Sequence, residues 1–195
     1  SNPAYFDMNY TYLKPTNGSI AESKIDLSSA SSNNIDDVTY TGNPIEPNVV
    51  LTLDNKTLKL DEDYTITYSN NTSVGTGEII INGINRYTGT KTISFKITPQ
   101  TISNVSLNSK TINSITFSWD KIDNITGYEV YKYDEFSNTY TLLDTISDNS
   151  INTYTDKNLT SASTYNYAIR PYKVIDKTAV DEISKSFFSF LEINM

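Results

Sequence analysis

The chain has 195 residues, 37% of them hydrophobic and 12% aromatic, a composition that supports folded domains over most of its length. It contains no cysteine and no histidine, which excludes disulfides, thiol nucleophiles, imidazole bases and the two commonest zinc ligands. The 15 Lys and Arg residues against 23 Asp and Glu residues give a net charge of −8, which argues against nucleic acid as a partner.

The length predicts two modest domains rather than one. No apolar run approaches the roughly 20 residues that a membrane-spanning helix needs, so membrane insertion is not expected. Neither a secretory leader nor a C-terminal sorting motif is present, and both are usual in surface proteins. We therefore expect the chain to be part of a longer protein.

Residues 1–22 fit neither of the two strand patterns that follow. They are too apolar for a free linker, because they include Tyr5, Phe6, Tyr10, Tyr12 and Leu13. We interpret them as an N-terminal segment, either the tail of a preceding domain or a strand added to its neighbour. An aromatic docking segment is the alternative.

Short alternating apolar runs between residues 40 and 97 predict a small all-β unit. These runs are Val49/Leu51/Leu53, Tyr64/Ile66/Tyr68, Ile79/Ile81 and Ile93/Phe95/Ile97, and turn residues separate them. The triplet Tyr-Thr-Gly occurs near both ends, at residues 40–42 and 87–89.

This segment resembles the bacterial immunoglobulin-like repeat of secreted and surface proteins of Gram-positive anaerobes. The shared phrases are Tyr40-Thr41-Gly42, Asp63-Tyr64-Thr65, Tyr68-Ser69-Asn70-Asn71, Gly75-Thr76-Gly77 and Phe95-Lys96-Ile97. The resemblance implies an immunoglobulin-like domain over residues 23–98. It also implies a role in displaying or spacing other domains.

Residues 99–195 carry a different strand pattern. Ile115, Phe117 and Trp119 alternate on one predicted strand. On the next, Tyr128 and Val130 occupy one face, while Tyr131 and Tyr133 occupy the other. Seven short strands at this spacing predict a β-sandwich.

This second region resembles a fibronectin type III domain. The resemblance rests on Phe117-Ser118-Trp119-Asp120, on Gly127-Tyr128-Glu129-Val130-Tyr131, and on Leu159 six residues before Tyr165. It implies that Trp119 lies in the core and that Tyr165 is the tyrosine corner, with its hydroxyl bonded to backbone near Leu159. The polar stretch from Tyr172 to Asp181 and the aromatic last strand, with Phe187, Phe188 and Phe190, depart from the family pattern.

The predicted fold class is therefore all-β. Two tandem β-sandwich domains are expected, the first immunoglobulin-like over residues 23–98 and the second fibronectin type III-like over residues 99–195. No segment has the period of a long helix.

Without histidine, catalysis would need paired carboxylates, as in glycosidases. The candidates are Asp36-Asp37 and Asp61-Glu62-Asp63, but acidic residues adjacent in sequence usually decorate turns. A calcium site would draw on the same residues, and the chain lacks an Asp-x-Asp-x-Asp-Gly loop. We therefore expect no enzyme and assign no catalytic residue, cofactor or metal ligand.

Tyrosines in the second region could form an exposed stripe that stacks on sugar rings: Tyr131, Tyr133, Tyr140, Tyr154, Tyr167 and Tyr172. Tyrosines on sandwich strands are, however, more often half-buried partners of residues on neighbouring strands. Tyr131, Tyr133 and Tyr172 are the candidate ligand-binding residues.

The expected function is a non-catalytic segment of an extracellular, cell-wall-associated bacterial protein that spaces and presents other domains of the same chain, such as a wall hydrolase or an adhesin head. The alternative is an adhesion module that binds carbohydrate or protein through an aromatic face. Cell-wall polysaccharide or a host surface glycan or protein is the expected partner in that case. The chain is expected to be a monomer.

Overall fold

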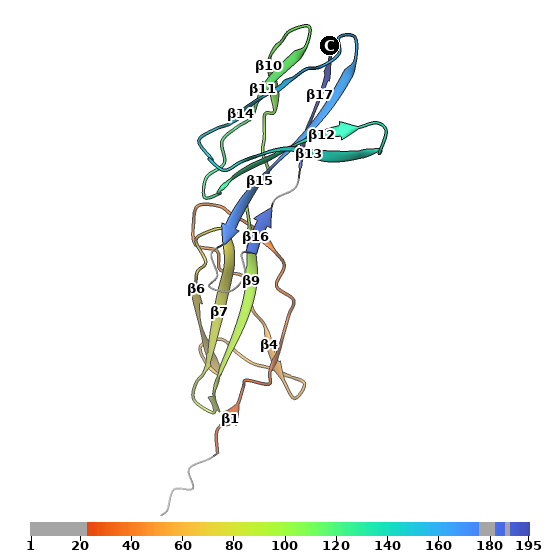
Figure 1. Ribbon diagram of the computed structural model, residues 1–195. Coiled ribbons are helices and arrows are strands. Elements are labelled where there is room, and N and C mark those ends of the chain that lie inside the picture. The colour runs from red at the N-terminus through yellow and green to blue at the C-terminus, as the bar shows by residue number, and fades with distance from the viewer. Residues whose placement is uncertain (1–22, 176–181, 186–187) are drawn as a thin grey trace, which may run out of the picture.

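The computed structural model describes residues 23–175, 182–185 and 188–195. All regular secondary structure in these ranges consists of β-strands, which confirms the predicted all-β class. Figure 1 shows the strands in two halves that follow one another along the long axis of the molecule. The prediction for residues 1–22 falls outside the described residues.

The N-terminal half consists of three longer strands, β6, β7 and β9, and six strands of two or three residues. In chain order they are β1 (Ile25–Asp26), β2 (Ser31–Ser32), β3 (Val38–Thr39), β4 (Leu51–Leu53), β5 (Lys56–Thr57), β6 (Tyr64–Ser69), β7 (Gly75–Gly83), β8 (Tyr87–Thr88) and β9 (Thr90–Thr98). One sheet has the order β3-β9-β7-β6 and another the order β2-β4-β5, while β1 pairs with β8 in parallel.

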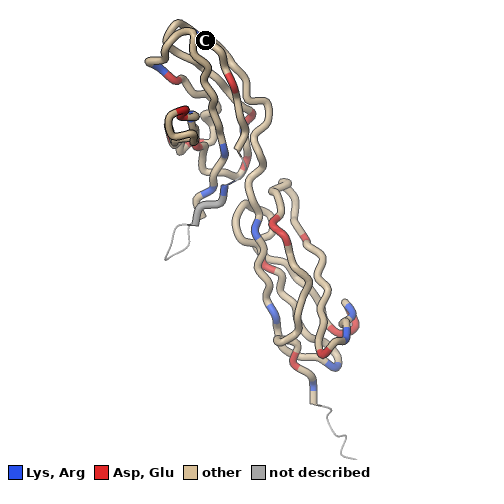
Figure 2. Tube along the Cα trace, turned by 90° about the vertical axis from the view of Figure 1, so that its right-hand side faces the viewer, with Lys and Arg blue, Asp and Glu red and all other residues tan. Residues whose placement is uncertain are grey.

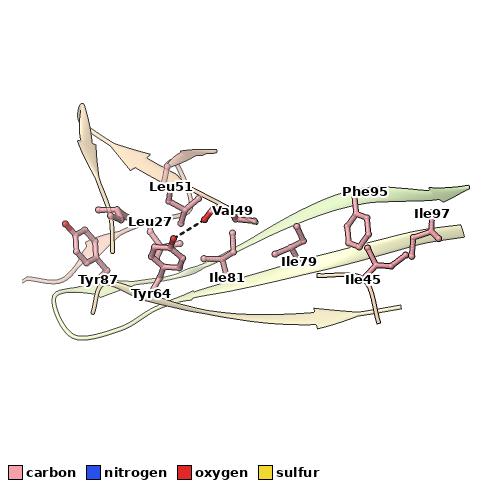
Figure 3. Packing of buried hydrophobic residues seen from close by; sticks show 12 residues of the cluster. Leu27, Ile45, Val49, Leu51, Tyr64, Ile79, Ile81, Tyr87, Phe95 and Ile97 are labelled. Carbon is pink, nitrogen blue, oxygen red and sulfur yellow. Dashed lines mark hydrogen bonds between the residues drawn. The ribbon is translucent and has the colours of Figure 1, made fainter. Parts of the chain in front are cut away.

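The core of this half lies between the two larger sheets (Figure 3). Leu51 of β4 faces Ile79 and Ile81 of β7, and all three are fully buried. The Tyr64 ring is buried as well, and its hydroxyl donates a hydrogen bond of 3.4 Å to the Val49 carbonyl. The alternating apolar residues therefore form one face of each sheet, as their period of two predicts.

Gly77 illustrates how tightly β7 and β9 pack. Its register partner is Phe95, and a Cβ atom at position 77 would lie 2.4 Å from the Phe95 ring. The ring therefore lies across the glycine, where any other residue would displace it. An aromatic ring that covers a glycine on the neighbouring strand is a known way of stabilising such a pair.

The C-terminal half is built from longer strands. They are β10 (Ser106–Lys110), β11 (Ser114–Ser118), β12 (Gly127–Asp134), β13 (Thr139–Ile146), β14 (Thr153–Lys157), β15 (Thr164–Ile175), β16 (Glu182–Lys185) and β17 (Ser189–Asn194). The first sheet has the order β10-β11-β14. The second has the order β13-β12-β15, and β15 pairs with β16 at one end and with β17 at the other.

Aromatic rings fill the space between these two sheets. The Phe117 ring centroid lies 4.7 Å from that of Tyr167 and 6.1 Å from that of Trp119, and Trp119 packs edge-on against Tyr128 at 5.2 Å. Trp119 is 2% exposed, and the other three rings are fully buried. Such tilted and edge-on pairs add stability beyond the burial of area alone.

A charged pair connects the two sheets beside this core. The Lys132 ammonium on β12 and the Tyr167 hydroxyl on β15 both donate to Oδ2 of Asp156 on β14, each at 2.9 Å. Burial and the hydrogen bond to Asp156 raise the pKa of Tyr167, which keeps its hydroxyl a neutral donor. The buried carboxylate on β14 therefore receives hydrogen bonds from two strands of the facing sheet.

The two halves meet at a short seam. Thr98 is bonded to the N-terminal half, since its carbonyl accepts from Tyr40 N at 2.9 Å. Ile102 is bonded to the C-terminal half, since its carbonyl accepts from the Ser189 hydroxyl at 2.6 Å. Ile97 lies in the first core and Ile102 in the second. Only residues 99–101 separate these two anchored positions.

We expect Trp119→Ala to lower the free energy of unfolding by about 3 to 5 kcal/mol, because it removes a large ring from a closely packed core. Urea unfolding followed by tyrosine fluorescence measures the loss. A loss below about 1 kcal/mol would show that the Trp119 ring does not carry this core.

Tyr165→Phe tests a second contact. The Tyr165 hydroxyl accepts from Thr160 N at 2.8 Å and lies 3.4 Å from the Thr160 carbonyl, so it connects the start of β15 to the loop before it. Its removal leaves the ring in place and should cost about 1 kcal/mol. Urea unfolding of this variant beside the wild type is the measurement, and equal stability would contradict the assignment.

Candidate functional site

One face of the second sheet of the C-terminal half carries a group of aromatic and charged residues. Tyr128 and Val130 of β12 point into the core, so the residues that alternate with them point away from it. We call the side turned away from the core the outer face. It includes Glu129, Tyr131, Tyr133, Tyr140, Leu142, Ala168, Arg170, Phe188 and Phe190.

Five rings form a continuous chain across the outer face. Centroid distances are 5.2 Å for Tyr133 and Tyr140, 5.5 Å for Tyr140 and Phe190, 6.1 Å for Phe190 and Phe188, and 5.0 Å for Phe188 and Tyr131. The angles between neighbouring ring planes run from 41° to 88°, so the rings are not coplanar. Phe190 is 61% exposed, whereas the other four rings are half-buried.

A buried ion pair lies beside the rings. Glu129 of β12 is 8% exposed and pairs in register with Arg170 of β15. Its carboxylate accepts from Arg170 Nε at 2.8 Å, from the Tyr131 hydroxyl at 2.8 Å and from Lys185 Nζ at 2.6 Å. The Arg170 guanidinium also lies over the Phe188 ring, 4.5 Å from its centroid. Arg170 therefore connects the charged and aromatic parts of the face.

These contacts set the ionisation of Glu129. Burial alone would raise its pKa, but the hydrogen bonds from Lys185, Arg170 and Tyr131 outweigh burial and lower the pKa below its usual value. Glu129 is therefore ionised near neutral pH and neutralised by two cations.

Among the residues that the structure describes, no other face is distinguished by its charge. Acidic and basic residues are interspersed along both halves (Figure 2). Within the described ranges, no group of three or more Asp and Glu residues is placed to hold a metal ion. Asp63 accepts from Lys59 N at 2.9 Å, and Glu62 pairs with Lys59 at 3.0 Å, so this acidic run belongs to a turn.

The structure divides the predicted tyrosine stripe. Tyr131, Tyr133 and Tyr140 lie on the outer face, whereas Tyr154 and Tyr167 pack in the core of the sandwich. Ligand binding by Tyr131 and Tyr133 stays a prediction.

The expectation of an exposed Tyr172 is wrong. This residue is only 5% exposed, and its hydroxyl lies 3.3 Å from that of Ser147. Its register partner on β12 is Gly127, where the Ile146 backbone occupies the place that a side chain would take.

Sequence reasoning did not include Arg170, Phe188 and Phe190 in the site. The signal for the two phenylalanines was present, because the last strand is more aromatic than the family pattern explains. The sequence had no signal for Arg170, because only the register Glu129↔Arg170 shows that it lies beside an acid on the outer face. Phe187 is outside the described residues.

The chain was compared with known proteins. No family model matches it, and no curated protein matches it. The solved structure of a two-domain fibronectin type III segment from chicken tenascin is 15% identical and has a TM-score of 0.57, with 86% of this chain and 98% of that one covered. The FN3tt crystal structure is 18% identical over 50% of this chain and 96% of its own, with a TM-score of 0.40.

The tenascin similarity shows the fold: a fibronectin type III-like β-sandwich of the immunoglobulin type. The assignment of residues 23–98 to the bacterial immunoglobulin-like repeat stays a prediction, as do the domain boundaries. In the part of the chain that the structure describes, no helix has the length and apolarity to cross a membrane.

We expect Glu129→Gln to cost about 1 to 3 kcal/mol at neutral pH, because it leaves Arg170 and Lys185 without their anionic partner. The pKa of Glu129 is lower in the folded protein than the roughly 4.3 of an unfolded chain. The contribution of ionised Glu129 to the free energy of unfolding is therefore complete above the unfolded pKa, and it is lost as the pH falls through the folded pKa. The difference in the free energy of unfolding between the wild type and Glu129→Gln should therefore shrink below about pH 4.

Urea unfolding between about pH 7 and pH 3 measures this difference. Glu192→Gln is the matched control, because Glu192 lies on β17 of the same sheet and is exposed. A cost of Glu129→Gln that stays constant over the whole pH range would contradict the role of the ion pair.

Proposed function

We propose that this chain is a non-catalytic segment of an extracellular, cell-wall-associated bacterial protein, and that it spaces and presents other domains of that protein. The observation that carries the proposal is the seam between Thr98 and Ile102. A linker of three residues with both ends held by hydrogen bonds permits little independent motion of the two halves.

Side-chain contacts across the seam support the same conclusion. The far end of β15 reaches the N-terminal half, where Ile175 Cδ1 lies 3.5 Å from the position that a Cβ atom of Gly75 would occupy. Asn124 also donates to the Ser73 hydroxyl at 3.4 Å. Both contacts lie on the same border of the N-terminal half, beside the start of β7. A stiff pair of sandwiches holds whatever precedes and follows it at a fixed separation.

A distance measurement between the halves tests the spacer role. The chain contains no cysteine, so Ser29→Cys and Ser161→Cys place one spin label on each half without side reactions. We expect a narrow distribution of label distances. A variant with a short flexible Gly-Ser insertion after Gln100 should give a broad one. A wild-type distribution as broad as that of the insertion variant would contradict a stiff spacer.

The outer face favours a second role, that of an adhesion module. Phe190 is 61% and Leu142 is 52% exposed, and both belong to the face that contains the chain of rings. An exposed apolar area with polar neighbours is typical of a contact surface. The partner class proposed for this role is cell-wall polysaccharide or a surface glycan.

A pull-down with insoluble Gram-positive cell wall tests the second role. We expect Phe190→Ala to weaken saturable binding of the chain to the wall about tenfold, the effect of losing about 1.4 kcal/mol of contact energy. Ile112→Ala is the matched control, since Ile112 is 81% exposed and lies between β10 and β11 of the other sheet. Absence of wall binding by the wild type would contradict the adhesion role and leave only the spacer role.

A further inference from the structure

The second sheet of the C-terminal half forks at one end. The pairing of β12 with β15 stops at Lys132↔Tyr167. Beyond this point β12 continues in register with β13 only, up to Asp134↔Thr139, and the first residues of β15 pair with β17 only. Figure 1 shows the β12–β13 hairpin diverging from β15 and β17. Two strand edges therefore face each other without a ladder between them.

A cavity of about 540 Å³ occupies this fork. Its lining comes from the end of β12, the following turn, β13 and the start of β15: Lys132, Tyr133, Asp134, Glu135, Thr141, Ser163, Thr164, Tyr165 and Asn166. The volume lies in the range of sites that hold small ligands. We call this cavity the fork cleft.

The polar lining of the fork cleft includes unused hydrogen-bonding capacity. Asn166 is half-buried, and its carboxamide makes no hydrogen bond with any described residue, although it offers two donors and one acceptor. The Ser163 hydroxyl, also half-buried, has no such partner either. Half-buried polar groups that lack a protein partner can form hydrogen bonds with water or with a ligand in the cavity.

Charge narrows the class of ligand. Lys132 is held by Asp156 at 2.9 Å, and both Asp134 oxygens accept bonds from the next turn, from Phe136 N at 2.9 Å and from the Ser137 hydroxyl at 3.1 Å. Glu135 makes no ion pair with a described residue. The charge left free in the cleft is therefore negative, which disfavours an anion.

The two tyrosine rings supply the apolar part of the lining. Tyr133 belongs to the outer face as well, and its edge contact with Tyr140 holds its ring in place. The Tyr165 ring is fixed by its hydroxyl bond to Thr160 N and by the Lys132 ammonium 5.6 Å from its centroid. A ring face beside amide and hydroxyl groups suits a molecule with one C–H face and many hydroxyls.

We propose that the fork cleft binds a neutral sugar unit of a polysaccharide. The sugar hydroxyls would bond the Asn166 carboxamide and the Ser163 hydroxyl, and a C–H face of its ring would pack on Tyr133. This inference deepens the adhesion role proposed above and does not depend on the spacer role.

An NMR titration of the ¹⁵N-labelled chain tests the proposal with three neutral probes: chitotetraose, cellotetraose and maltotetraose. We expect at least one of them to shift the backbone amides of residues 132–135 and 163–166. Asn166→Ala should weaken that binding about five- to tenfold, since it removes one or two hydrogen bonds. Asn149→Ala, the same change in the loop between β13 and β14, should leave the affinity unchanged.

Tyr133 provides a second pair of variants. Tyr133→Phe keeps the ring and should retain most of the affinity, whereas Tyr133→Ala should abolish detectable binding. Circular dichroism and the unperturbed amide signals of the N-terminal half verify that each variant is folded. If Tyr133→Ala does not fold, the comparison of Asn166→Ala with Asn149→Ala still decides the question.

Three outcomes would overturn the proposal. The first is no shift of these amides by any of the probes, and the second is equal affinity in Asn166→Ala and wild type. The third is a shift by calcium chloride but by no saccharide, which would make the cleft a cation site. One form of the first outcome, in which the shifts are confined to amides of Leu142, Ala168 and Phe190, would refute the cleft while leaving adhesion through the outer face intact.

Discussion

The alternation of side chains along β15 is the constraint on which the C-terminal half depends. Tyr167 and Ile169 point inward and are fully buried, and each contributes about 1.5 to 3 kcal/mol through burial. Because successive residues of a strand point to opposite sides, their burial places Asn166 and Arg170 on the other side of the sheet. A slip of one residue would expose the core and bury the arginine, so the register is strongly specified.

One strand thereby connects the three features that bear on function. Its first residues form one wall of the fork cleft, its middle contributes Arg170 to the outer face, and its end reaches Gly75 across the seam. The rings and the ion pair of the outer face are coupled, because Arg170 contacts Phe188 and Glu129 at once. Changes in the centre of β15 should therefore disturb binding and stability together, whereas changes at its ends should affect one feature alone.

Spacing and adhesion are compatible roles for such a molecule. The seam involves the border between the halves, while the outer face and the fork cleft use one sheet of the C-terminal half. A stiff junction limits the orientations in which a weak site can meet a polymer such as cell-wall polysaccharide. Rigid presentation strengthens binding when several copies act together, because each further contact is made at a high effective concentration.

The sequence by itself determined the all-β class, the shared face of Phe117 and Trp119, and the opposite faces of Val130 and Tyr131. These follow from the period of two, a local property that any strand must obey. Only the tertiary structure decided that Tyr172 is buried opposite Gly127, that Arg170 meets Glu129, and that β12 and β15 separate after Lys132. Each of these depends on the register between strands far apart in the chain, and alternation within one strand carries no information about its partner.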